Sequence, residues 1–110
     1  MANTYKILGQ ANPSATSNVD LYTVPSGTAT IVSSLVVTNV TAAAALAHVF
    51  VRAAGVSATT GNAIMYDVTV AANSVATFTL GITMGAGDVI TVRSDTANAI
   101  AFHAFGSEVI

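Results

Sequence analysis

The chain has 110 residues, of which 53% are hydrophobic and only 7% are charged, with a net charge of −2. A soluble domain ordinarily carries about 25% charged residues, so this composition is typical of a protein that works within a larger assembly. Lys6, Arg52 and Arg93 are the only basic residues, too few to form a nucleic-acid surface. No apolar run is suited to a membrane helix, so we expect neither nucleic-acid nor membrane partners.

The length predicts one domain, residues 1–110, which can bury a core without disulfides; the chain has no cysteine. Blocks rich in Val, Ile and Thr alternate with turn residues along the whole sequence, which predicts strands. The expected strands are residues 4–10, 19–24, 28–39, 47–53, 63–70, 74–84, 89–94 and 99–108. Residues 41–46, although rich in alanine, are too few for a stable helix and are expected to be a loop or a single helical turn.

Alternation of apolar and polar residues predicts which side chains enter the core. In the segment 76–84 every even position is apolar, so Phe78, Leu80 and Ile82 should face inward. A similar pattern in 63–70 places Tyr66 inward and Asp67 on the opposite, solvated face. Eight short strands with regular turns predict an all-β fold, a two-sheet antiparallel β-sandwich of the jelly-roll type, with an immunoglobulin-like sandwich as the alternative.

Two segments are candidate contact surfaces. Residues 31–37 (IVSSLVV) are apolar on both faces of the expected strand, which a strand covered on one side only does not need. Residues 1–12, before Pro13, are a candidate N-terminal arm, because terminal segments are often free unless they are tied down. We therefore look for subunit contacts at these two places.

Side chains able to do chemistry are few. His48 and His103 are the only histidines, and a metal site would need both plus a carboxylate from elsewhere. The carboxylates are scattered, and no serine lies in a nucleophile elbow. We therefore expect no catalytic, cofactor-binding or metal-binding residues and no cofactor, and the protein is not expected to be an enzyme.

Two further motifs have a structural and a functional interpretation. Asn39-Val40-Thr41 matches a glycosylation acceptor, although we interpret the match as chance. Four aromatic residues could form a sugar-binding platform if they share one sheet, but core or interface packing is the favoured interpretation. These aromatic residues are Tyr5, Tyr22, Phe50 and Tyr66.

Six short blocks give the chain a family likeness. They are residues 21–27 (LYTVPSG), 31–39 (IVSSLVVTN), 66–68 (YDV) with 71–73 (AAN), 79–82 (TLGI), 86–89 (AGDV) and 105–108 (FGSE). In their order and spacing, they resemble small all-β virion proteins of tailed bacteriophages, cyanophages included. The resemblance covers most of the chain after its N-terminal segment.

The resemblance implies a non-enzymatic structural component located in the virion and assembled in the host cytoplasm. It implies a capsid decoration, or cement, protein that contacts the major capsid protein and copies of itself, often as a homotrimer. The alternative is a β-sandwich of the neck, tail or baseplate that binds host glycans. None of the blocks decides between these positions.

Overall fold

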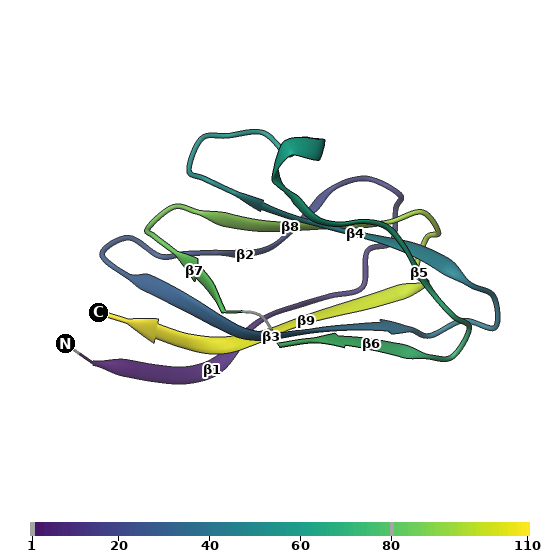
Figure 1. Ribbon diagram of the computed structural model, residues 1–110, viewed down its shortest axis with the longest axis horizontal. Helices are drawn as coiled ribbons and strands as arrows, with labels where there is room; N and C mark the ends of the chain where they lie inside the picture. Colours follow the sequence, from purple (N-terminus) through teal and green to yellow (C-terminus); the bar gives the residue numbers. More distant parts are fainter. Residues whose placement is uncertain (1, 80) are drawn as a thin grey trace.

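A computed structural model describes residues 2–79 and 81–110 of the chain (Figure 1). Within these residues the protein is all-β, with one short 3₁₀ helix and no helix of the length and apolarity that crossing a bilayer takes. The elements are β1 (Asn3–Ala11), β2 (Val19–Thr23), β3 (Ala29–Asn39), β4 (Ala45–Arg52), η1 (Thr60–Asn62), β5 (Ala63–Val70), β6 (Val75–Phe78), β7 (Ile82–Met84), β8 (Val89–Ser94) and β9 (Ile100–Val109).

The strands form two antiparallel sheets packed face to face, which confirms the predicted all-β sandwich (Figure 1). Sheet A has the order β1-β9-β3-β6, with β7 pairing to the other end of β3, and sheet B has the order β2-β8-β4-β5. Strands β1 to β4 alternate between the two sheets, and the last strand, β9, lies between β1 and β3. Ala2 and Ile110 exchange two backbone hydrogen bonds (3.3 and 3.0 Å), so both ends of the chain leave at one corner.

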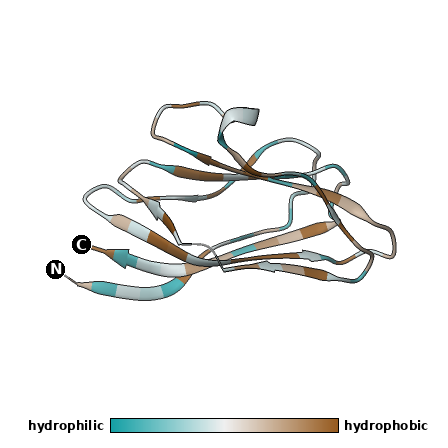
Figure 2. Ribbon diagram, in the orientation of Figure 1, coloured by the Kyte–Doolittle hydropathy of each residue, from teal (hydrophilic) through white to brown (hydrophobic). Residues whose placement is uncertain are grey.

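The core lies between the sheets and is made of aliphatic side chains with few aromatics. Figure 2 shows brown, hydrophobic segments along β3, β4 and β8 and teal, hydrophilic segments on β1. Along β3, buried residues recur with the period of two that a strand with one covered face requires, on either side of a one-residue shift at Ser33. The largest fully buried side chains include Phe102, Leu35, Met84, Ile90 and Ile100.

The expected strand at residues 74–84 is wrong as a single element. It consists of β6 and β7, which pair with opposite ends of β3. Between the two paired regions, β3 carries a bulge at Ser33, where it shifts register against β9. Phe78 and Ile82 are partly buried against the core as predicted, whereas Leu80 lies outside the described residues.

The prediction of which β5 side chains point into the core is also wrong at the centre of the strand. Met65 is buried and Tyr66 is 49% exposed, the reverse of the simple alternation. Asp67 has a positive φ of 52° and the register of β5 against β4 shifts there, so the strand carries a bulge that turns Tyr66 outward. Val70, beyond the bulge, is buried as the pattern predicts.

The other segments follow the sequence-based expectations only in part. Residues 41–44 form a loop before β4, but the predicted loop at residues 41–46 is wrong at its end, because Ala45 and Leu46 pair with Val70 and Thr69 as the start of β4. Residues 3–11, within the segment considered as an arm, are paired along β9 as an edge strand of sheet A. In β3, Val32 and Leu35 are fully buried, but Ile31 on the other face is 44% exposed.

Candidate functional site

The outer face of sheet A carries a hollow lined mainly by apolar groups. Its volume is about 560 Å³, and it is lined by Asn3, Tyr5, Lys6, Ile31, Ser33, Phe105, Gly106 and Ser107. We call the outer surface formed by Tyr5, Ile7, Ile31 and Phe105 the sheet A face. Such an apolar surface is a candidate contact site, because exposed apolar patches on soluble proteins commonly mark interactions.

Strand register explains why these residues meet. Tyr5 on β1 pairs with Ser107 on β9, and Ser107 pairs with Ile31 on β3, so three neighbouring side chains point to the same side. Tyr5 is 81% exposed, more than the other large hydrophobic residues described. Tyr5 and Ile31 therefore lie on either side of Ser107. Because the serine side chain is much smaller than its two neighbours, the surface is hollowed between them.

Gly106 forms part of the hollow for a steric reason. A Cβ atom at this position would lie 2.0 Å from the backbone oxygen of Ile31, a distance that real side chains do not reach. Gly106 pairs with Val32, directly before the register shift of β3 at Ser33. Glycine is therefore required where the two strands approach each other, and the surface has no side chain there.

A histidine lies farther along the same face. The rings of His103 and Phe105 are stacked, with centroids 6.2 Å apart and planes inclined by 10°. Gln10 Nε2 donates to His103 Nδ1 over 3.1 Å. His103 therefore has a neutral amide partner and serves as an extension of the aromatic surface.

A polar network lies on the inner side of the same strands. The Tyr22 hydroxyl donates to Glu108 Oε2 (2.6 Å), so the Thr30 hydroxyl, 2.7 Å away, donates to Tyr22. Lys6 Nζ bonds the other carboxylate oxygen of Glu108 at 3.1 Å. The hydrogen bond from Tyr22, together with Lys6, lowers the pKa of Glu108. Burial, followed by the bond to Glu108, raises the pKa of Tyr22 to about 12.

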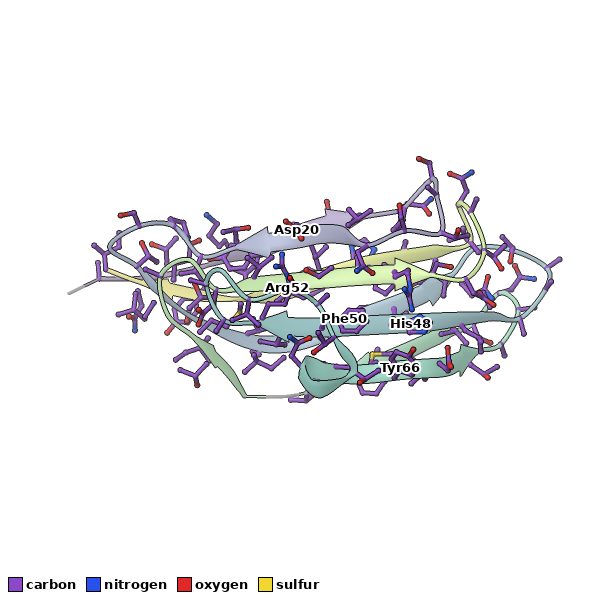
Figure 3. All side chains as sticks on the ribbon, turned by 90° about the horizontal axis from the view of Figure 1, so that it is seen from above. Asp20, His48, Phe50, Arg52 and Tyr66 are labelled. Atoms are coloured by element: carbon purple, nitrogen blue, oxygen red, sulfur yellow. The ribbon has the colours of Figure 1, made fainter. Side chains whose placement is uncertain are left out.

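The outer face of sheet B carries a second cluster, formed by His48, Phe50, Tyr66 and Asp67 (Figure 3). His48 and Phe50 lie two residues apart on β4, and both are only 3% exposed although they point outward from the sandwich. The ring of Tyr66 meets His48 edge-on, with centroids 4.7 Å apart. The bulge of β5 thus turns Tyr66 over the histidine and shields it from water.

His48 and Asp67 form the one pair in this cluster that resembles acid–base machinery. His48 Nε2 donates to Asp67 Oδ1 over 2.7 Å. Its other ring nitrogen, Nδ1, is buried and has no hydrogen-bond partner among the described residues. A catalytic histidine of a hydrolytic triad needs a nucleophile on that second nitrogen, so the pair has the geometry of a structural contact.

Arg52 fixes the loop that follows β4 to the same face. Its Nη1 donates to the backbone oxygen of Val56 (2.7 Å), and its Nη2 and Nε contact Asp20 (3.1 Å) and Thr91 (2.8 Å). Figure 1 shows η1 above β4, on the outer side of sheet B. Sheet B is therefore partly covered by its own loop, whereas the hollow of the sheet A face is open.

The sandwich separates residues that the sequence left as possible partners. His48 lies on sheet B and His103 on sheet A, so they do not meet, and the described residues hold no group of three potential metal ligands. Tyr22 and Phe50 are buried, and Tyr5 and Tyr66 lie on different sheets. The four aromatic residues therefore form no common platform.

The asparagine of the glycosylation motif is buried as well. Asn39 is 1% exposed, and its Nδ2 donates to the backbone oxygens of Ala43 and Val70. Its Oδ1 accepts from the backbone N–H and the hydroxyl of Thr41. The side chain links the β3–β4 loop to the end of β5, which gives this asparagine a structural role.

Sequence reasoning identified part of the sheet A face and missed the rest. The apolar segment 31–37 pointed to Ile31, but the role of Phe105 was not recognised. The outward alternation of His103 and Phe105 in the last strand was the available signal.

Comparison of the sequence with models of known protein families and with curated proteins finds no match.

Proposed function

We propose that the protein is a non-enzymatic structural component of a tailed-phage virion. In this proposal it is a capsid decoration, or cement, protein that stabilises the shell through contacts with the major capsid protein and with copies of itself. The resemblance of its sequence blocks to small virion proteins suggests the setting. The observation that carries the proposal is the open, apolar sheet A face, because such a surface suits a contact between proteins.

The charge distribution supports an assembly role. The one cation beside the hollow, Lys6, is already paired with Glu108 at 3.1 Å. Burial of this face therefore leaves no unpaired charge in a contact, which avoids a penalty of several kcal/mol. The molecule measures 45 × 26 × 20 Å, so one sheet face offers roughly 1,200 Å², and a standard interface uses about 800 Å² per partner.

The strand order supports the jelly-roll assignment. Successive strands from β1 to β4 alternate between the sheets, and β8 and β9 return to lie between earlier strands. In an immunoglobulin-like sandwich the first two strands lie in the same sheet, whereas β1 and β2 lie in different sheets here. Jelly rolls occur in viral capsid proteins, which is compatible with a virion component.

Sheet B supports a binding role over an enzymatic one. Its buried His48–Asp67 pair is covered by Tyr66, and neither group lines the hollow on the opposite sheet. The His48–Asp67 pair, which resembles acid–base machinery, therefore lies apart from the open hollow of sheet A. An enzyme would need both at one place.

A co-sedimentation experiment tests the proposal. Purified protein is mixed with phage capsids that lack it, and the bound fraction and the thermal rupture of the capsids are measured. Ile31→Asp on the sheet A face should weaken capsid binding at least about tenfold, because an unpaired charge would be buried. Ile64→Asp on β5 is the matched control, since Ile64 and Ile31 are both 44% exposed.

The control variant should bind and stabilise capsids as the unaltered protein does. Failure of the unaltered protein to bind capsids would contradict the decoration role. Cryo-electron microscopy of the phage particle gives the location directly. Density at the neck, tail or baseplate would assign the protein to that part of the virion.

A further inference from the structure

The free edges of the two sheets differ in how well they are protected from pairing with another strand. An exposed edge strand can pair with another chain unless a bulge, a charge or an interruption prevents it. β2 shifts register between Asp20 and Tyr22, and β5 bulges at Asp67. On the far side of sheet A, β6 ends at Phe78 and β7 begins at Ile82. These edges are short or distorted.

The first half of β1 lacks such an interruption. Residues 3–7 are all exposed and pair with β9 in continuous register, and the bulge comes only after Ile7. Their sequence, NTYKI, has a single charge. Among the described residues, these five therefore form the longest stretch of free edge without a register shift.

The register shows which backbone groups are free. Antiparallel pairs alternate between residues that exchange hydrogen bonds and residues that do not. Ala2 and Ile110 exchange two bonds, so Thr4 and Lys6 also face β9. The N–H and C=O groups of Asn3, Tyr5 and Ile7 consequently point away from the sheet, to the free edge.

We propose that two copies of this chain pair through antiparallel β1 strands, with a two-fold axis at Tyr5. Tyr5 then faces Tyr5 of the second copy, and Asn3 faces Ile7 in both directions. All the free groups of residues 3–7 are used, which gives about six backbone hydrogen bonds by the ladder geometry. The contact is self-complementary, as a two-fold interface must be.

The position of Lys6 selects this register. If the two-fold axis lay at Lys6 instead of Tyr5, the two Lys6 side chains would be directly opposite each other, and opposed like charges are destabilising. With the axis at Tyr5, Lys6 faces Thr4 of the second copy, and its ammonium group stays paired with its own Glu108 at 3.1 Å. An inward charge on an edge strand normally discourages pairing, but here that charge is neutralised within the same subunit.

The pairing also joins the two sheet A faces. Tyr5 is 81% exposed and Ile7 is 54% exposed in the single chain, and both lie beside the new strand contact. The two A sheets become one continuous sheet, with the two hollows side by side on the same surface. This inference does not depend on the virion assignment, and it predicts a dimer where the family resemblance implies a homotrimer.

The first test is the molar mass in solution. Size-exclusion chromatography with light scattering should give twice the chain mass of 11.0 kDa at micromolar concentration. Tyr5→Pro removes a free-edge N–H while sparing the bonds to β9, a place where strands tolerate proline; it should give a monomer. Tyr5→Thr keeps the N–H and should remain dimeric. A monomeric or trimeric unaltered protein would overturn the inference.

A cross-link covers the case in which Tyr5→Pro does not fold. The chain has no cysteine, so Tyr5→Cys supplies a single thiol. Opposed residues in a hydrogen-bonded pair have Cα atoms about 5.5 Å apart, within the range of a disulfide. Mild oxidation should therefore yield a covalent dimer of Tyr5→Cys, while Tyr66→Cys on sheet B should form no disulfide between subunits and run as a single chain in denaturing electrophoresis without reductant. Equal cross-linking of the two variants would contradict pairing at β1.

Discussion

The Tyr22 hydroxyl donates a hydrogen bond of 2.6 Å to Glu108, and this bond joins the two sheets. Tyr22 belongs to β2 of sheet B, and Glu108 belongs to β9 of sheet A. Glu108 also bonds Lys6 on β1 at 3.1 Å. One carboxylate thus connects three strands near the corner where the chain ends lie.

Removal of this hydroxyl should weaken the fold. Tyr22→Phe leaves the Glu108 carboxylate without its short donor, and hydrogen bonds to charged groups contribute about 1.5–3 kcal/mol. We expect the free energy of unfolding to fall by about 2 kcal/mol in urea denaturation. Tyr66→Phe is the control, since Tyr66 is 49% exposed on sheet B. Equal losses in the two variants would contradict a specific role for the Tyr22 bond.

Acid should destabilise the protein through the same carboxylate. The folded state lowers the pKa of Glu108 below its ordinary value of 4.5, so the folded protein binds that proton less readily than the unfolded chain. The stabilisation is therefore present above about pH 4.5 and is lost as the pH falls through the lowered pKa. Melting temperatures measured across this range should fall more steeply for the unaltered protein than for Glu108→Gln. Parallel curves would contradict the linkage.

The bulge at Asp67 should tolerate asparagine and resist alanine. Asp67 has a φ of 52° and accepts a 2.7 Å hydrogen bond from His48. Asp67→Ala loses that bond and places a residue with low tolerance for the left-handed region there, for a combined cost of about 2 kcal/mol. Asp67→Asn keeps an acceptor and a suitable backbone, so its cost should stay below about 1 kcal/mol. Thermal unfolding of both variants decides between these expectations.

The glycine at residue 106 should be irreplaceable for steric reasons. In Gly106→Ala the new Cβ would lie 2.0 Å from the Ile31 oxygen, so β9 and β3 would have to separate. We expect a loss of at least about 3 kcal/mol or failure to fold. Gly81→Ala is the matched control, because a Cβ there meets nothing within 4 Å. Chemical denaturation of both proteins gives the comparison.

Much of the fold is predictable from local pattern, but the contacts between strands are not. The limits of β5 and β8 agree with the predicted 63–70 and 89–94 because apolar alternation and turn residues define them. The outward turn of Tyr66 depends on a bulge set by pairing with β4. The Tyr22–Glu108 bond spans 86 residues of sequence. Neither relationship leaves a local signal, because each arises only when distant strands pack.

The candidate site was predictable only in outline. The segment 31–37 and the N-terminal segment were expected to make contacts, and Ile31 and Tyr5 from these segments both line the hollow. Phe105, Gly106 and Ser107, which also line the hollow, come from the last strand through cross-strand register. Periodicity tells which side of a strand a residue occupies, but the neighbours across the sheet depend on the order of the strands.

The buried amide of Asn39 has a practical consequence for producing the protein. A eukaryotic secretory host would meet Asn39-Val40-Thr41 on the growing chain, before folding hides it. A glycan attached to Nδ2 would take the place of a proton that this nitrogen donates to Ala43 or Val70. It would also have to fit where the side chain is 1% exposed. Glycosylation and folding would therefore compete for the same chain, and Thr41→Ala would remove the acceptor motif while leaving the amide's own donor bonds in place.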